Sequence, residues 1–208
     1  MARLFVPGFG ARPGFYRAAL GEAWLVHEPP PFRSGAGFAE HVAALRTQVA
    51  SLDAPVTLAG HSLGAAVSVA AAAEMPGLVA RLLLIAPAGL PLTKPVRESL
   101  GELRTQVREG AYPSLELARA VAGALRAPRS AWRLGQAVRA LDLRTELAAV
   151  RAAGIRCEVV GCAGDTLTPV EHCRRVARLA GAEFREIAAQ GGHMWPVIDP
   201  RAFGALSF

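Results

Sequence analysis

The chain has 208 residues, of which 52% are hydrophobic and 19% charged, a balance that favours one folded domain and excludes a disordered chain. Its formal net charge is +6, but 22 of its 23 basic residues are arginine, a skew typical of GC-rich coding bias. Because no block of like charges or aromatic-plus-basic stripe is present, we expect no nucleic-acid partner.

Membrane, secretory and metal-dependent roles are not indicated either. The most apolar stretch, residues 63–92, is broken by charged residues and prolines, and residues 1–7 lack the long apolar region of a signal peptide. Cys157, Cys162 and Cys173 cannot all pair and form no C-x-x-C motif, so we expect buried reduced thiols. We therefore predict a cytoplasmic protein with no membrane partner, no metal and no cofactor.

Short apolar runs alternate with helical patterns along most of the chain. In chain order, the predicted strands cover Leu4–Val6, Trp24–Val26, Val56–Ala59, Arg81–Ala86, Ile155–Gly161 and Glu183–Ile187. The predicted helices among them cover Gly14–Ala23, Phe38–Leu52, Leu63–Glu74, Asp142–Ala153, Pro169–Ala180 and Pro200–Leu206. Such alternation indicates a parallel sheet with helices on both faces, in which reactive residues gather at the carboxyl ends of the strands.

One segment departs from this alternation. From residue 89 to about residue 140 the strand patterns stop, and helices are predicted over residues 96–108, 114–126 and 130–140. The sequence thus predicts a core made of residues 1–88 and 141–208, with a helical cap inserted over residues 89–140. Between residues 90 and 140 there are nine basic and four acidic residues, so this cap is strongly basic.

The most informative motif is the pentapeptide that runs from Gly60 to Gly64, between a predicted strand and a predicted helix. It fits the G-x-S-x-G nucleophile elbow, in which a sharp turn projects the serine hydroxyl at the carboxyl end of a strand. Gly60 and Gly64 would relieve crowding around that turn because they lack a Cβ. Ser62 is therefore the predicted nucleophile.

A serine nucleophile needs a base, and the chain offers five histidines: His27, His41, His61, His172 and His193. His193 follows the last predicted strand in a glycine-rich loop, and it completes the chain order Ser…acid…His of this elbow class. The predicted helices place His41 and His172 toward solvent, and the elbow points His61 away from the Ser62 hydroxyl. His27 ends the second strand, near the active edge but early in the chain. His193 is the predicted base.

The base must be oriented by an acid, and the chain has four aspartates: Asp53, Asp142, Asp165 and Asp199. Asp165 lies in a glycine-marked loop directly after the strand that ends at Gly161, at the reactive edge of the sheet. An ordinary turn aspartate is the alternative interpretation. Asp142 has the position of an N-cap for the helix that follows it. Asp165 is the predicted third member of a triad.

Attack by a serine creates an oxyanion, which needs preorganised N–H donors. The backbone N–H of Leu63, at the start of the predicted helix, is one candidate. The second is the N–H of Phe9 in the loop after the first strand, where Gly8 lets the backbone approach. A plain tight turn is the alternative for this loop.

Taken in order, these markers resemble the α/β-hydrolase superfamily, specifically its small capped esterases and carbon–carbon bond hydrolases, and the resemblance covers nearly the whole chain. It implies a three-layer α/β fold, a triad of Ser62, Asp165 and His193, and oxyanion donors at Phe9 and Leu63. Pro7 stands where the family usually has histidine. The family's first two strands are missing, so we expect a mostly parallel sheet of about six strands with a more exposed edge at the first strand.

The resemblance implies a serine esterase that acts on a small-molecule ester through an acyl-enzyme. A carbon–carbon bond hydrolase, a thioesterase or a haloperoxidase-like enzyme would use the same triad, and a non-catalytic binding protein is a further alternative. The basic cap favours an anionic substrate or an acidic acyl carrier protein, as in esterases of the pimeloyl-carrier-protein methyl ester type. A solvated arginine-rich surface is the alternative. Residues expected to line the pocket are Gly35–Gly37, Leu90, Trp132 and Trp195, with core packing an equal alternative for the tryptophans.

Overall fold

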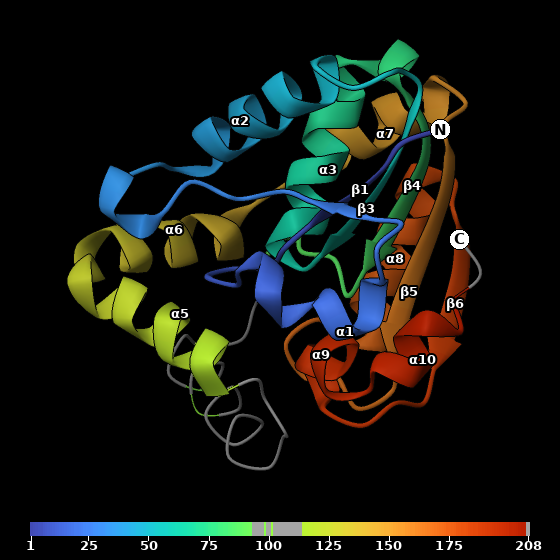
Figure 1. Ribbon diagram of the computed structural model, residues 1–208. Coiled ribbons are helices and arrows are strands. Elements are labelled where there is room, and N and C mark those ends of the chain that lie inside the picture. The colour runs from blue at the N-terminus through green and yellow to red at the C-terminus, as the bar shows by residue number, and fades with distance from the viewer. Residues whose placement is uncertain (93–97, 99–100, 102–113, 207–208) are drawn as a thin grey trace.

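Six parallel strands form one sheet in the spatial order β2-β1-β3-β4-β5-β6. They are β1 (Arg3–Val6), β2 (Leu25–Val26), β3 (Val56–His61), β4 (Val79–Ile85), β5 (Arg156–Cys162) and β6 (Glu183–Ile187). The computed structural model, shown in Figure 1, describes residues 1–92, 98, 101 and 114–206. All six strands predicted from the apolar runs are confirmed.

The edges of this sheet differ from expectation. β1 lies inside the sheet, between β2 and β3, so β2 forms the edge on that side. β2 has only two residues, and the N–H of His27 continues its pairing by donating to Phe5 O at 2.8 Å. The prediction that the first strand borders the exposed edge is therefore wrong, because the chain crosses outward from β1 to β2 before it returns inward to β3. An edge this short offers few unpaired backbone groups to another strand.

The helices follow most of the predicted periodic segments. They are α1 (Arg17–Leu20), α2 (Phe38–Ala50), α3 (Leu63–Glu74), α5 (Ser114–Arg126), α6 (Pro128–Ala140), α7 (Arg144–Ala152), α8 (Val170–Ala180), α9 (Trp195–Ile198) and α10 (Pro200–Gly204). Short 3₁₀ segments are η1 (Pro13–Phe15), η2 (Phe32–Ser34), η3 (Pro76–Leu78) and η4 (Gly192–Met194). The helix predicted over residues 96–108 lies outside the described residues.

Asp142 does not cap α7, contrary to the prediction. The N-cap residue is Leu143, and Asp142 instead forms a side-chain ion pair with Arg144. Asp199, not predicted as a cap, is the N-cap of α10 and accepts the N–H of Ala202 at 3.1 Å.

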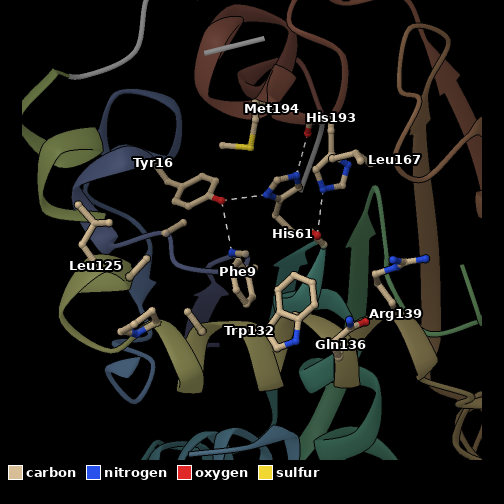
Figure 2. A pocket seen from close by; sticks show the side chains of 17 residues that line it. Phe9, Tyr16, His61, Leu125, Trp132, Gln136, Arg139, Leu167, His193 and Met194 are labelled. Carbon is tan, nitrogen blue, oxygen red and sulfur yellow. Dashed lines mark hydrogen bonds between the residues drawn. The ribbon is translucent and has the colours of Figure 1, made fainter. Parts of the chain in front are cut away.

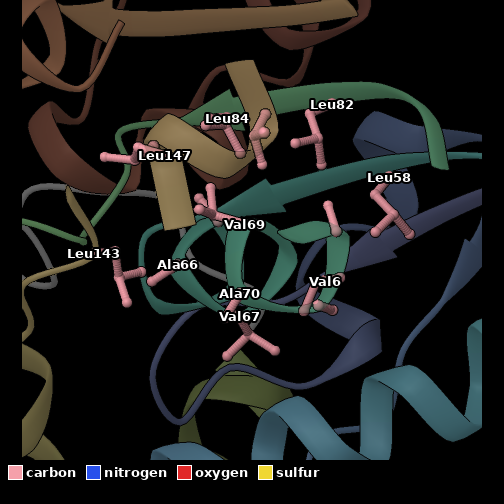
Figure 3. Close-up of a cluster of buried hydrophobic side chains, with 14 of the residues drawn as sticks. Val6, Leu58, Ala66, Val67, Val69, Ala70, Leu82, Leu84, Leu143 and Leu147 are labelled. Atoms are coloured by element: carbon pink, nitrogen blue, oxygen red, sulfur yellow. The ribbon is translucent and has the colours of Figure 1, made fainter. Parts of the chain in front are cut away.

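Successive residues of the strands point to opposite faces of the sheet. On one face, Leu82 and Leu84 of β4 pack with Leu58 of β3 and with buried side chains of α3 and α7 (Figure 3). Buried side chains of α2 and α8 belong to the same cluster. On the other face, Leu83 and Ile85 pack with buried side chains of α1, α9 and α10. Both faces are covered at the centre of the sheet, which explains why β1 and β3 are almost wholly buried, whereas the edge strand β6 is largely exposed.

Helices α5 and α6 lie beyond the carboxyl ends of the strands (Figure 1), and α6 adds the buried Leu134 and Val138 to the first of these layers. They pack against η1 and η2, and α6 also contacts α2. The division into a core of residues 1–88 and 141–208 and a cap over residues 89–140 stays a prediction. What the structure adds is that the two described helices of that segment cover the reactive edge of the sheet.

Candidate active site

The turn between β3 and α3 has the strained geometry expected of an elbow. Ser62 has φ 56° and ψ −115°, a combination that non-glycine residues rarely adopt and that costs about 1–3 kcal/mol. A Cβ on Gly60 would lie 2.5 Å from Gly64 O, and one on Gly64 would collide with the carbonyls of Val6 and Pro7. Both flanking positions therefore require glycine, because α3 begins directly against β1 and β3.

Ser62, His193 and Asp165 form a continuous hydrogen-bonded chain. His193 Nε2 lies 2.9 Å from Ser62 Oγ, and His193 Nδ1 lies 2.8 Å from Asp165 Oδ2. The three residues follow β3, β6 and β5 at the carboxyl ends of these strands. Asp165 and His193 are buried, whereas Ser62 is half-buried and reaches a pocket. The structure thus brings together the three residues that the sequence singles out as a triad.

Asp165 is held as a charged acceptor. Burial alone would raise its pKa, but the nearby His193 and hydrogen bonds from His193 and Thr168 lower it overall. Asp165 Oδ1 accepts the N–H groups of Leu167 at 2.8 Å and Thr168 at 2.9 Å, and Thr168 Oγ1 donates to Oδ2 at 2.8 Å. Because an ionised carboxylate only accepts, His193 carries its proton on Nδ1 and leaves Nε2 free to accept the Ser62 hydroxyl proton.

The loop that carries His193 depends on two glycines. Gly191 has φ 95° and Gly192 has φ 53°, both in the left-handed region that favours glycine. The turn lets the chain reverse after β6 and enter the 3₁₀ segment η4, so that the imidazole points back over the end of β3. The Gly-Gly pair is the sequence signal of this reversal.

The two predicted oxyanion donors belong to segments that adjoin Ser62. Leu63 is the first residue of α3, so its N–H has no acceptor within the helix. The Gly8 backbone is close enough that a Cβ there would lie 3.0 Å from His61 Nδ1 and 3.5 Å from Ser62 Cβ. Phe9, the next residue, places its ring against Phe32 with the centroids 5.2 Å apart.

Two of the other histidines correct the sequence-based predictions. His41 is buried rather than solvent-facing, and its Nδ1 donates to Gly37 O at 2.7 Å. His172 is half-buried, and its Nε2 donates to Pro87 O at 3.1 Å. His27 is also buried, with Nδ1 2.6 Å from Gln48 Oε1. None of these three contacts Ser62 among the described hydrogen bonds, whereas His193 does.

The site opens on a pocket of about 460 Å³, whose lining side chains are mostly apolar. Figure 2 shows Leu125 on one side of it and Gln136 and Arg139 on the other, with Trp132 between them. The lining residues are Gly8, Phe9, Ala11, Tyr16, His61, Ser62, Ala124, Leu125, Pro128, Ala131, Trp132, Gly135, Gln136, Arg139, Leu167, His193 and Met194. Trp132 is thus confirmed as a lining residue.

The remaining predicted lining residues do not contribute to this pocket. Leu90 and Trp195 are fully buried in the two core layers, and Gly35–Gly37 lie outside the lining. The error arises because an apolar residue near the reactive edge is equally able to pack inward. In contrast, α5 and α6 supply nearly half of the lining, which could not be predicted without knowing how these helices sit on the core.

Several further features of the described residues bear on function. None of their helices is long and apolar enough to cross a membrane, and no group of three or more metal-ligating side chains occurs among them. Cys157, Cys162 and Cys173 are free and buried, and burial raises the pKa values of Cys157 and Cys173 to about 12.

Comparisons with known proteins agree with this geometry. A family model described as "Alpha/beta hydrolase family" matches residues 4–206. Among solved structures, the chain is similar to an N-acyl homoserine lactone degrading enzyme, with 17% identity, TM-score 0.77, and coverage of 99% of this chain and 91% of that one. It is also similar to a hydrolase from Oleispira antarctica, with 16% identity, TM-score 0.74, and coverage of 99% and 88%. No curated protein matched the sequence.

A serine hydrolase involved in carbazole degradation is a third similar structure, with 18% identity, TM-score 0.74, and coverage of 98% and 88%. At these identities the likeness shows the fold, a six-stranded parallel sheet flanked by helices.

Proposed function

Because the chain belongs to the alpha/beta hydrolase family, we propose that it hydrolyses a carboxylic ester through Ser62, His193 and Asp165. The observation that carries this proposal is the continuous hydrogen-bonded chain from the Asp165 carboxylate to the Ser62 hydroxyl. The positive φ of Ser62 adds support, because strained backbone conformations persist only where the surrounding structure enforces them, and they cluster at active sites.

The geometry fits a two-step acyl transfer. His193 Nε2 takes the Ser62 proton as Oγ attacks the ester carbonyl, and the negative charge moves to the carbonyl oxygen. In this proposal the N–H groups of Leu63 and Phe9 hold that oxyanion. The tetrahedral species then expels the alcohol, which receives the proton from His193. A water molecule, deprotonated by the same imidazole, releases the carboxylic acid and regenerates Ser62.

The pocket supports an ester with an apolar acyl chain. None of the described lining residues is acidic, and the side chains around Leu125, Trp132 and Met194 offer apolar surface to an acyl group. Gln136 and Arg139 form the more polar side, where they could meet a polar leaving group or a second carbonyl (Figure 2). A thioester or a carbon–carbon bond flanked by a carbonyl would use the same triad. A matched panel of esters, thioesters and vinylogous diketones distinguishes these substrates.

The decisive experiment treats the protein with a fluorophosphonate probe and measures its intact mass. The wild type should gain one adduct, Ser62→Ala should gain none, and His193→Ala should react far more slowly. His27→Ala is the matched control, because it removes a buried histidine that lies outside the triad. A folded wild type that never forms an adduct would exclude an activated serine and favour a binding role.

The charge of α5 and α6 supports a second candidate, in which the ester is linked to an acidic carrier. Residues 114–140 hold five arginines and one glutamate. Arg126, Arg129 and Arg133 are exposed, and each directly follows a pocket-lining residue in the sequence, so we call these three arginines the positive rim. An acidic acyl carrier protein, or an anionic group on a small substrate, would meet this positive rim.

Reversing Arg126, Arg129 and Arg133 to glutamate tests that candidate. The triple variant should turn over a carrier-linked ester far more slowly while it keeps its rate on a small neutral ester. The matched control reverses Arg156, Arg175 and Arg201, which are also exposed but lie outside the pocket lining. Equal losses in both triple variants would contradict a specific docking role for the rim.

A further inference from the structure

His61, the residue before the proposed nucleophile, is fully buried and takes part in a hydrogen-bonded chain of its own. Its Nδ1 lies 2.9 Å from Tyr16 Oη, and its Nε2 lies 2.9 Å from the backbone oxygen of His193. Tyr16 Oη also lies 3.4 Å from the backbone nitrogen of Gly8. These contacts, drawn in Figure 2, link three segments that the proposed reaction needs: the Gly8–Phe9 loop, the serine turn and the His193 loop.

The groups at the two ends determine the direction of every hydrogen bond in this chain. A carbonyl oxygen can only accept, so His61 Nε2 carries a proton and donates it to His193 O. Burial, followed by the nearby His193, lowers the pKa of His61 to about 3, so the ring is neutral and its Nδ1 accepts. Tyr16 must therefore donate its hydroxyl proton to Nδ1. Its oxygen in turn accepts the N–H of Gly8.

We infer that Tyr16 and His61 are a positioning pair that holds the backbone of the base loop and of the oxyanion loop in register with Ser62. This inference rests on the proposed hydrolase function. Neither side chain exchanges a proton with substrate in this role. Each side chain donates one hydrogen bond and accepts one. Together they accept the N–H of Gly8 and donate to the C=O of His193, in two loops that are distant in sequence.

The base loop needs such an anchor because its own backbone is permissive. Gly191 and Gly192 precede His193, and glycine loses more conformational freedom on ordering than other residues do. The imidazole is oriented through its side chain by Asp165, and the bond from Met194 N–H to Gly191 O at 3.0 Å closes the turn on itself, but the turn still needs a constraint relative to Ser62. The bond from His61 to His193 O supplies that constraint from the residue adjacent to the nucleophile. A shift of one loop would otherwise lengthen the His193–Ser62 hydrogen bond.

The oxyanion loop is held through the same pair. Tyr16 is fully buried, its ring lies 4.6 Å from the ring of Phe5, and its hydroxyl reaches the N–H of Gly8 next to the proposed donor Phe9. Removing the Tyr16 hydroxyl should therefore disturb the position of the Phe9 N–H while the aromatic packing remains. His61 and Tyr16 contribute no charge to the reaction, which separates their role from that of Asp165.

The first test is spectroscopic and does not depend on turnover. In uniformly ¹⁵N-labelled protein, His61 should show a protonated Nε2, an unprotonated Nδ1, and no titration between pH 8 and pH 5. Tyr16→Phe should shift the Nδ1 resonance of His61 and the amide resonance of Gly8. A His61 ring protonated on Nδ1, or one that titrates near its ordinary pKa, would overturn the hydrogen-bond directions and with them the inference.

The second test is kinetic, on a chromogenic ester with an acyl chain that the wild type accepts. His61→Leu should lower kcat by about 100-fold with KM changed less than about twofold, since a misplacement of about 1 Å in a catalytic group has an effect of this size. Tyr16→Phe should give a smaller loss of the same kind. His61→Gln, whose amide offers both a donor and an acceptor, should recover about tenfold of the loss.

A matched control separates positioning from general destabilisation. His27 is another buried histidine with a side-chain hydrogen bond, and it lies outside the pocket lining. His27→Leu should lower the urea midpoint without changing kcat. If wild type labels with the fluorophosphonate probe and His61→Leu keeps its kcat, the inference is wrong and the proposed function stands. If wild type never labels, the proposed function fails, and the positioning role fails with it.

Discussion

At the scale of single residues, the site depends on groups that orient its members as well as on the members themselves. Thr168 is the clearest case, since its N–H and its hydroxyl both donate to Asp165, at 2.9 Å and 2.8 Å. Its hydroxyl also lies 3.3 Å from His193 Nδ1. Thr168 therefore fixes which oxygen of Asp165 faces the imidazole.

Replacing Thr168 tests this arrangement. Thr168→Val removes the hydroxyl but keeps the backbone donor, so one charge-assisted hydrogen bond is lost, worth about 1.5–3 kcal/mol. We expect kcat to fall by about tenfold to 100-fold with KM little changed, because the hydroxyl orients the carboxylate and not the substrate. Steady-state kinetics measures both parameters. A full loss of activity with unchanged stability would instead mean that the hydroxyl touches the substrate.

Gly64 gives a stability prediction at the same scale. Gly64→Ala would force a Cβ onto the carbonyls of Val6 and Pro7, which should cost about 4 kcal/mol or prevent folding. Gly77→Ala is the matched control, because no heavy atom lies within 4 Å of its would-be Cβ. Urea unfolding followed by circular dichroism measures the difference. Similar midpoints for the two variants would contradict the close packing of α3 against β1.

His61 also makes stability depend on pH. Its pKa is about 3 in the folded protein, against the ordinary value of 6.5, so the unfolded chain binds a proton that the folded protein excludes. The contribution is complete above pH 6.5 and is lost as the pH falls toward 3, at about 1.4 kcal/mol for each pH unit. The difference in unfolding free energy between wild type and His61→Gln should shrink by about 1 kcal/mol from pH 6.5 to pH 5.5, because the unfolded histidine is already half protonated at pH 6.5. Equal pH slopes would mean that His61 is protonated in the folded state.

At the scale of elements, the helix ends show what local sequence can and cannot specify. Asp142 and Asp199 both precede a helix, but Asp199 is the N-cap of α10 and accepts the N–H of Ala202 at 3.1 Å, whereas Asp142 precedes the N-cap of α7 and accepts the N–H of Arg144 at 3.4 Å. Asp142 is exposed and pairs with Arg144, which lowers the pKa of its carboxyl. A basic side chain two residues away competes with the N–H groups of the helix for the carboxylate.

This contrast predicts different effects of two alanine substitutions. Asp199→Ala should lower the free energy of unfolding by about 1 kcal/mol, because α10 packs Phe203 into the core. Asp142→Ala should leave stability little changed. Thermal unfolding of the two variants side by side decides between them, and a larger loss from Asp142→Ala would reverse the assignment.

The strands and the triad could be predicted from sequence, whereas the contacts that orient the triad residues and their loops could not. Most strands are short apolar runs between turn signals, whereas β6 has three charged residues among five, and Ser62, Asp165 and His193 each follow a predicted strand. The roles of Thr168 and Tyr16 depend on distances across the sheet edge, which no local pattern encodes. The burial of His41 was missed because the polarity of its helix face is decided by what α2 packs against.

At the scale of the whole molecule, α5 and α6 turn an open sheet edge into a pocket. Trp132 of α6 lines this pocket and remains 53% exposed, so it lies at the boundary between the pocket and solvent. An apolar side chain in that position gains contact with a long acyl chain and none with an acetyl group.

Trp132→Ala should therefore raise KM for octanoyl esters by about tenfold, the equivalent of about 1.4 kcal/mol of lost contact, with KM for acetyl esters unchanged. Leu115→Ala is the matched control, since Leu115 is also exposed on this pair of helices but lies outside the pocket lining. Kinetics across an acyl-length series measures both. An equal rise for every ester would place Trp132 at the leaving-group side.

The order of the strands has a consequence for how the protein acquires its activity. Ser62 and His193 are 131 residues apart in sequence, and their hydrogen bond requires β3, β5 and β6 to be in place together. Contacts over such separations form late, because closing long loops is entropically unfavourable until the intervening structure supports them. During refolding from urea, helical circular dichroism should therefore return before fluorophosphonate labelling does. The time course of labelling at Ser62 would then report when the last strand joins the sheet.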